Sequence, residues 1–343
     1  MKAENINSPI KIITSPDAVK AFGEREIFAA DVLVGLSETN KYLPSKYLYD
    51  EEGSRLFTKI TNLKEYYPTS CEKETLQRNK EQIAAHVSAQ PFNLVEFGSG
   101  DGQKTSVLID HFLTQKYEFQ YVPIDISHSA NIELVDKFIT DFPELDMEAL
   151  TSDYFAGIRC LNNRSARRNL VLFLGSSIGN FSHAEARVFL RNLWNCLKNE
   201  DLLLIGFDLK KDIELLLSAY NDPAGVTALF NLNLLARIND ELGGRFNLEN
   251  FRHFGTYDVF SGAMESYLVS LVQQEVFIEE IGCSFKFRPW EPIHTEYSYK
   301  YLKSDIEQLA RETGFQVCEH LYDSRKYFVD SIWEVRKTPQ AKG

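Results

Sequence analysis

The residues best suited to chemistry begin with a glycine-rich turn. Residues 94–102 read LVEFGSGDG, in which an apolar stretch runs into Gly98, Gly100 and Gly102 before a helical pattern opens at Lys104. Glycine permits positive φ and lets a ligand approach the backbone closely, so such a turn suits a nucleotide-like ligand. The alternative is a tight turn that only joins a strand to a helix.

Acidic residues stand where the next two strands are expected to end. Asp125 closes the stretch YVPID, and a carboxylate there can accept both hydroxyls of a ribose. Asp153 and Tyr154 follow the third expected strand, although either residue alone is more often a helix cap or a packing aromatic. A pyrophosphate would favour G-x-G-x-x-G, whereas the spacing here, from Glu96, is E-x-G-x-G-x-G and resembles the first motif of class I methyltransferases.

A second group of candidates lies outside the glycine turn. Asn180, in the stretch LFLGSSIGNF after a fourth expected strand, could hold both an amine and a carboxylate, or could only form an Asx turn. Four tyrosines within residues 47–67 form either a packed lid or a polar-tipped pocket. Glu296 and Ser298 share one face if the backbone is extended, the alternative being a solvated strand edge.

The elements that must position these residues follow from hydrophobic patterning. Short apolar stretches at 92–97, 119–124, 169–174 and 202–207 are expected to be buried strands. Helical patterns at 104–115, 130–142 and 183–198 lie between them. Alternating strands and helices predict a mostly parallel α/β sheet that is covered on both faces.

The pattern changes after residue 208. A helical region at 210–242 is broken by the turn signal NDPAG, strand-like alternation covers 256–287, and a helix at 303–313 precedes two final strands at 315–321 and 331–335. We therefore expect four parts: 1–70, read as helices and loops, as the N-terminal part of a substrate-binding lobe; 71–211 as a Rossmann-like domain; 212–297 as an inserted substrate-binding lobe; and 298–343 as the C-terminal completion of the Rossmann-like domain.

Composition narrows the range of partners. The 343 residues include 37 basic and 49 acidic ones, a net charge of −12, which disfavours nucleic acid and anionic membranes as partners. Five cysteines without a C-x-x-C pair predict reduced thiols and no metal site. The first fifteen residues lack the apolar core of a signal peptide, and no apolar run is long enough for a membrane helix, so we expect a cytoplasmic protein. We also expect it to be a monomer that acts on a small-molecule substrate.

Six segments together resemble one known family. YLYDEEGSRLFTKITNLKEYYPT, VEFGSGDGQKT, YVPIDIS, FLGSSIGNF, AYNDPAGVTALFN and HTEYSYKY occur in one order across residues 47–301 and are similar to histidine-specific methyltransferases that depend on S-adenosylmethionine (SAM). The resemblance implies a class I methyltransferase fold, with a Rossmann-like, mostly parallel sheet and a second substrate-binding lobe. It further implies trimethylation of the α-amino group of L-histidine to hercynine, the first step toward ergothioneine. Fungal relatives methylate the amine of prenylated tryptophan.

The resemblance also implies roles for individual residues. Those expected to bind SAM are Gly98, Lys104, Asp125, Asp153 and Tyr154. Those expected to bind the amino acid are Tyr66, Gly175, Asn180, Tyr220, Glu296 and Ser298, with Tyr49 lining the site. Glu296 and Ser298 match the pair that recognises imidazole in the family. Asn180 and Tyr49 are the catalytic candidates, which we expect to orient the amine and not to act as a formal base.

One departure and three alternatives accompany this interpretation. The family typically has methionine where Ser266 stands, which predicts a looser pocket wall and less strict selection of histidine. The alternatives are an N-methyltransferase of another aromatic amino acid such as a tryptophan derivative, a nicotinamide-dependent oxidoreductase, and a nucleoside-binding regulator without activity. The oxidoreductase is disfavoured by the glycine spacing and by the lack of a placed catalytic His or Lys.

Overall fold

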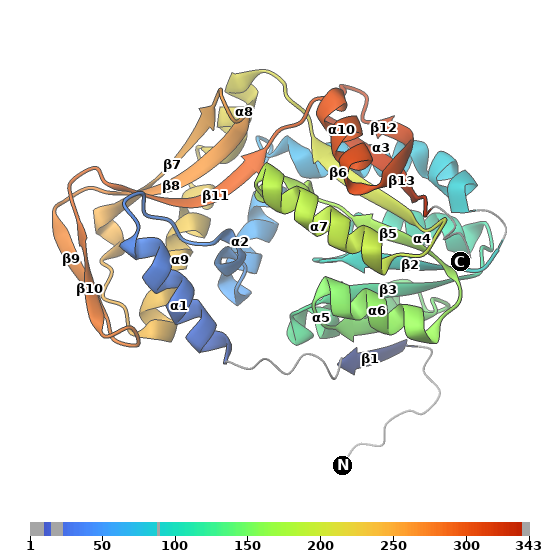
Figure 1. The fold of residues 1–343 in the computed structure, drawn as a ribbon, viewed down its shortest axis with the longest axis horizontal. Helices are drawn as coiled ribbons and strands as arrows, with labels where there is room; N and C mark the ends of the chain where they lie inside the picture. The colour runs from blue at the N-terminus through green and yellow to red at the C-terminus, as the bar shows by residue number, and fades with distance from the viewer. Residues whose placement is uncertain (1–9, 15–22, 88–89, 338–343) are drawn as a thin grey trace, which may run out of the picture.

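The computed structural model describes residues 10–14, 23–87 and 90–337, and its centre is an eight-stranded sheet (Figure 1). Six strands run parallel in the order β1 (Ile10–Thr14), β4 (Met147–Thr151), β3 (Phe119–Asp125), β2 (Phe92–Phe97), β5 (Arg168–Phe173) and β6 (Leu202–Asp208). Beyond β6 lies β13 (Phe328–Val335), which is antiparallel both to β6 and to the edge strand β12 (Phe315–Tyr322). The predicted mostly parallel α/β sheet is therefore confirmed.

Helices cover both faces of this sheet, which explains why its central strands are largely apolar. Every residue of β2 and β6 is buried. On one face α6 (Tyr154–Arg164), α7 (His183–Cys196) and α10 (Lys303–Thr313) pack on the strands; on the other lie α3 (Tyr67–Val87), α4 (Ser106–Thr114) and α5 (His128–Asp141). Strands buried on both faces read as continuous apolar runs, and this is the pattern that made them predictable.

A second hydrophobic core joins segments from distant parts of the chain. Its helices are α1 (Glu24–Ser37), α2 (Glu51–Thr61) and α9 (Val226–Leu242), and side chains from all three share one core cluster. The same core includes a hairpin of β9 (Gln274–Ile278) and β10 (Cys283–Phe287) and an antiparallel sheet of β7 (Phe251–Asp258), β8 (Ala263–Ser270) and β11 (Pro292–Tyr299). This packing supports a second lobe, and the division at residues 70, 211 and 297 stays a prediction.

The N-terminal part differs from the expectation of helices and loops alone. Residues Ile10–Thr14 form β1, which adds to the edge of the large sheet by pairing in parallel with β4. The stretch IKIIT is rich in β-branched residues, but it is too short and too far from the other strands for its pattern to identify a partner. The other residues among the first fifteen, for which we expect no signal peptide, lie outside the described part of the chain.

Candidate active site

The glycine-rich turn follows β2 directly, as predicted, and needs its glycines. Gly98, Gly100 and Gly102 all have positive φ, at 65°, 54° and 67°. A Cβ on Gly98 would lie 2.9 Å from the hydroxyl oxygen of Tyr154, whereas a Cβ on Gly100 would meet nothing within 4 Å. The turn is thus tight on the side of Tyr154 and open at Gly100, where a ligand can approach the backbone.

Of the other residues predicted to bind SAM, Tyr154 and Asp125 lie near this turn, whereas Asp153 caps a helix. The Tyr154 ring stacks on Phe97 with 4.6 Å between centroids, and the charge of Asp125 contributes to the raised pKa of Tyr154. Burial raises the pKa of Asp125, which accepts the backbone N–H of Ser127 at 2.8 Å. Asp153 is the N-cap of α6, where its Oδ1 accepts two backbone N–H groups at 3.1 and 2.9 Å. The helix-cap alternative therefore describes part of what Asp153 does.

Glu72, which the sequence analysis missed, connects the two predicted halves of the site. Its buried carboxylate accepts Lys104 Nζ at 2.6 Å and the backbone N–H of Gly175 at 2.7 Å. A Cβ on Gly206 would lie only 2.4 Å from Glu72 Oε1, so the carboxylate reaches this position because β6 has glycine there. The available signal was a charged residue among the buried positions of α3.

Asn180 is placed by a short 3-10 turn against the strand that carries Glu296 and Ser298. This turn, η3 (Ser177–Asn180), packs on β11 so closely that a Cβ on Gly179 would lie 2.9 Å from the backbone oxygen of Tyr299. Asn180 Nδ2 donates to Glu296 Oε1 at 3.3 Å. Two predicted substrate residues that lie 116 positions apart in the sequence are thus in direct contact.

An irregularity in β11 explains how Glu296 and Ser298 come to face inward together. Ile293 pairs with Leu268 of β8 on the core face, and the register then shifts between His294 and Glu296. After this bulge, Glu296 pairs with Ser266 and Ser298 with Met264. Because cross-strand partners share a face, the bulge turns Glu296 and Ser298 to the side that Ile293 occupies before it.

Three tyrosines surround the Glu296 carboxylate. Burial is the main cause that raises the pKa of Tyr49, Tyr66 and Tyr220 well above the ordinary value, and the charge of Glu296 adds to it in each case. Tyr49 is 40% exposed as a whole residue, while its hydroxyl group interacts with both Asn180 and Glu296. All three phenols therefore stay protonated at neutral pH and offer hydroxyl groups, not phenolates.

The acid at the centre of this group has an unusual pKa. Burial raises the pKa of Glu296 to about 7, and the charge of Lys300 and hydrogen bonding from Tyr49 act in the opposite direction. Ser266, predicted to loosen the pocket wall, is buried directly opposite Glu296 in the sheet. Its effect on selectivity stays a prediction.

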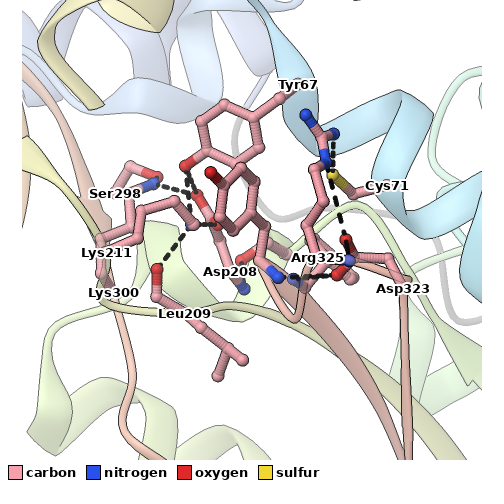
Figure 2. A network of polar contacts seen from close by, with 12 residues as sticks. Tyr67, Cys71, Asp208, Leu209, Lys211, Ser298, Lys300, Asp323 and Arg325 are labelled. Carbon is pink, nitrogen blue, oxygen red and sulfur yellow. Dashed lines mark hydrogen bonds and ion pairs between the residues drawn. The ribbon is translucent and has the colours of Figure 1, made fainter. Parts of the chain in front are cut away.

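A buried polar network lies behind Ser298, and Figure 2 shows it from close by. At the end of β6, Asp208 accepts Tyr67 Oη at 2.7 Å and Lys300 Nζ at 2.9 Å, and it also pairs with Lys211. Burial opposes ionisation of Asp208, but Lys300 and Lys211 outweigh it and lower the pKa of the carboxyl. Asp208 is therefore a buried carboxylate between two lysines.

Tyr220 and Ser298, both predicted to bind the substrate, also join this network. Tyr220 Oη donates to Ser298 Oγ at 2.7 Å, and Lys300 Nζ donates to both oxygens at 2.8 Å. Tyr220 is the last residue of α8 (Ile213–Tyr220), which ends before the predicted NDPAG break. None of Asp208, Lys211 and Lys300 was identified from the sequence, because only the fold brings Asp208 to Lys300, which lies beside Ser298.

The assembled site contains hydroxyl, amide and carboxylate groups and a glycine turn. Across residues 10–14, 23–87 and 90–337, no cluster of His, Cys, Asp or Glu side chains could hold a metal ion. Over that same part of the chain, none of the helices combines the length and apolar character needed to cross a bilayer. The arrangement can bind a nucleoside-containing donor beside an amino acid and orient one against the other.

Comparison with known proteins gives a consistent result. A family model described as histidine-specific methyltransferase, SAM-dependent, matches residues 28–335. The chain is 34% identical over 291 residues to a histidine N-alpha-methyltransferase of Mycolicibacterium smegmatis, covering 85% of this chain and 89% of that protein. It is 36% identical over 271 residues to a protein of the same name from Mycobacterium tuberculosis, covering 79% of this chain and 83% of that protein.

More distant similarities extend to a fungal protein and to solved structures. Ergothioneine biosynthesis protein 1 of Schizosaccharomyces pombe is 29% identical over 307 residues, which cover 87% of this chain and 40% of that protein. The structure of magnesium protoporphyrin IX methyltransferase from Synechocystis PCC 6803 with bound SAH is similar with a TM-score of 0.41 and 12% identity, over 85% of this chain and 98% of that one.

Proposed function

The chain belongs to the family of histidine-specific, SAM-dependent methyltransferases, and on this premise we propose that it trimethylates the α-amino group of L-histidine to hercynine. The observation that carries the proposal is the contact between Asn180 and Glu296, which joins the loop after β5 to the strand that presents Ser298. A role in ergothioneine synthesis is proposed with it, supported by the printed name of the fungal relative.

The residues present fit SAM as the methyl donor. We assign its binding to Gly98, Lys104, Asp125, Asp153 and Tyr154, because the turn is open at Gly100 and Asp125 ends β3, where a ribose is recognised in such folds. Bound SAM supplies an electrophilic sulfonium methyl group. Lys104 is held at 2.6 Å by Glu72, whose other oxygen fixes the Gly175 backbone, so the donor side and the acceptor side share one carboxylate.

The amino acid is assigned to the opposite side of Glu72. Its contacts would be made by Tyr66, Gly175, Asn180, Tyr220, Glu296 and Ser298, with Tyr49 lining the site. Asn180 supplies an amide that can hold the amine and the carboxylate, while Glu296 and Ser298 lie on one face of β11 where the side chain would reach them. Holding the amine in place accounts for most of the acceleration that such a site provides.

We assign no residue of the site as a dedicated general base. The α-amine must lose its proton before it can accept a methyl group, since only the neutral amine has a lone pair. The raised pKa of Tyr49 keeps its phenol protonated, which excludes a Tyr49 phenolate as the base at neutral pH. Tyr49 and Asn180 therefore act by orienting the lone pair.

Mass spectrometry of the purified protein with SAM and all twenty amino acids tests the proposal. We expect a gain of three methyl masses on histidine and none of comparable size on another amino acid. Methylation of tryptophan without histidine would instead support the alternative that Ser266, small and buried opposite Glu296, suggests. Retention of SAM without any product would refute the methyltransferase activity of this chain.

A further inference from the structure

Lys300 is a buried lysine whose ammonium group contacts the hydroxyl oxygen of Ser298. Its side chain is 0% exposed, and its Nζ lies 2.8 Å from Tyr220 Oη, 2.8 Å from Ser298 Oγ and 2.9 Å from Asp208 Oδ2. An ammonium group carries three hydrogens and no lone pair. These three contacts account for all three hydrogens, so both hydroxyl oxygens must accept from Lys300.

The hydrogen of the Ser298 hydroxyl is fixed by this arrangement. Tyr220 donates to Ser298 at 2.7 Å, as expected of a phenol, which is more acidic than an aliphatic alcohol. Ser298 Oγ then accepts two hydrogen bonds, which fills both of its lone pairs. Among the described residues no acceptor is found for its own hydrogen, which is left to point toward a ligand.

We propose that Lys300 is a positioning residue that sets substrate specificity by holding Ser298 as a hydrogen-bond donor toward the bound side chain. The inference rests on the proposed function. Glu296, two residues away on the same face, supplies the acceptor, so the pair offers one acceptor and one donor. A neutral imidazole matches this pair, because it has one N–H and one nitrogen lone pair. Rings with an N–H but no basic nitrogen, such as indole and pyrrole, leave the Ser298 donor unpaired.

The discriminating probes are two histidine analogues in which one ring nitrogen is replaced by CH. Pyrrol-2-yl-alanine and pyrrol-3-yl-alanine keep the N–H at one or the other position and lack the lone pair. Calorimetric titration of each amino acid into the protein with S-adenosylhomocysteine, which cannot transfer a methyl group, gives dissociation constants. Because an unpaired donor is costly, we expect the wild type to prefer histidine over the better analogue by about tenfold or more.

Two variants separate positioning of Ser298 from simple loss of charge. Lys300→Met removes the ammonium from Ser298, Tyr220 and Asp208, while Lys211→Met removes an ammonium from Asp208 without touching Ser298 or Tyr220. In Lys300→Met the Ser298 hydroxyl can turn toward Tyr220, so we expect the preference for histidine to fall to about threefold or less. Lys211→Met should keep the wild-type preference.

The outcomes distinguish this inference from the proposed function. An unchanged preference in Lys300→Met, or an equal loss in Lys211→Met, would overturn the role of Lys300 while leaving histidine as the substrate. Failure of the wild type to bind histidine would overturn both. If Lys300→Met does not fold, the same comparison is made between Asp208→Asn/Lys300→Met and Asp208→Asn/Lys211→Met, which have no buried carboxylate at Asp208.

Discussion

Replacing Glu296 by Ala should reduce selection of histidine more than it reduces methyl transfer. The carboxylate is buried among Tyr49, Tyr66 and Tyr220 and contacts Asn180. In the proposed complex it accepts an imidazole N–H, and a hydrogen bond to a charged group contributes about 1.5–3 kcal/mol. Since 1.36 kcal/mol is a tenfold effect, kcat/KM for histidine should fall by about 10- to 150-fold.

A second substitution at this position separates charge from shape. Glu296→Gln keeps a carbonyl acceptor but cannot ionise, so it resembles the protonated acid. Because the pKa of Glu296 is raised to about 7, the wild type gains its carboxylate as the pH rises through 7. We expect the ratio of wild-type to Glu296→Gln kcat/KM for histidine to increase between pH 6 and pH 8, with deprotonation of the substrate amine cancelling in the ratio.

The assay compares kcat/KM for histidine and tryptophan in wild type and Glu296→Ala. Tryptophan has no second ring nitrogen and should lose less, so the histidine-to-tryptophan ratio should fall by at least tenfold, helped by the small Ser266 opposite Glu296. A ratio that stays within about threefold, or about 0.7 kcal/mol, would refute recognition of the side chain by Glu296. Glu265→Ala, a carboxylate one position from Ser266 on β8, serves as a control that should leave the ratio unchanged.

Three further outcomes are expected. Asp125→Ala should weaken SAM binding, since each lost charge-assisted hydrogen bond to a ribose contributes about 1.5–3 kcal/mol. Calorimetry showing wild-type affinity in the folded variant would remove Asp125 from the site, and replacement of the exposed Asp110 of α4 by Ala is the control. Asn180→Ala should lower kcat by orders of magnitude while SAM affinity changes little, and comparable turnover at saturating histidine would leave Asn180 with a turn role only. Burial raises the pKa of Glu96 in the folded protein from 4.5 to about 7. Because the unfolded chain releases the Glu96 proton at lower pH than the folded protein does, the free energy of unfolding should fall by about 3 kcal/mol as the pH rises from 4.5 to 7. Glu96→Gln should lack this part of the fall in urea titrations, and an identical pH dependence in both proteins would contradict the raised pKa.

The sequence predicted the elements whose patterns are local. The strand at 92–97 and the helix at 303–313 have the predicted bounds, because a doubly covered strand and a helix closed by glycine both leave strong local patterns. Gly314 indeed has φ of 96° at the end of α10. β1 was not predicted, because it is itself an edge strand and its only partner, β4, lies more than a hundred residues away in the sequence.

Side-chain positions in the site depended on features that have no local pattern. The spacing of Glu296 and Ser298 predicted a shared face, but the bulge that directs this face inward depends on how β11 pairs with β8. Glu72 is a single charged residue in a long helix, and its role requires Gly206 on β6 to make room for the carboxylate. Such contacts between distant segments follow from the fold and not from spacing.

The same network explains how the predicted inserted lobe can hold the residues that we propose bind the substrate in register with the sheet. The chain leaves the sheet after Asp208 and returns at Tyr301, and these two points are hydrogen-bonded: Tyr301 N–H donates to the Asp208 backbone oxygen and Lys210 N–H to that of Tyr301, both at 3.0 Å. Lys211 and Lys300 flank this junction and both pair with the Asp208 carboxylate. Because Ser298 lies two residues before Lys300 and is bound by it, the position of the proposed specificity residue is set at the point where the lobe joins the sheet. Movement of the lobe about this junction would have to break the buried pairs of Asp208, which is costly, so the geometry between Ser298 and the end of β6 is expected to persist when ligands bind.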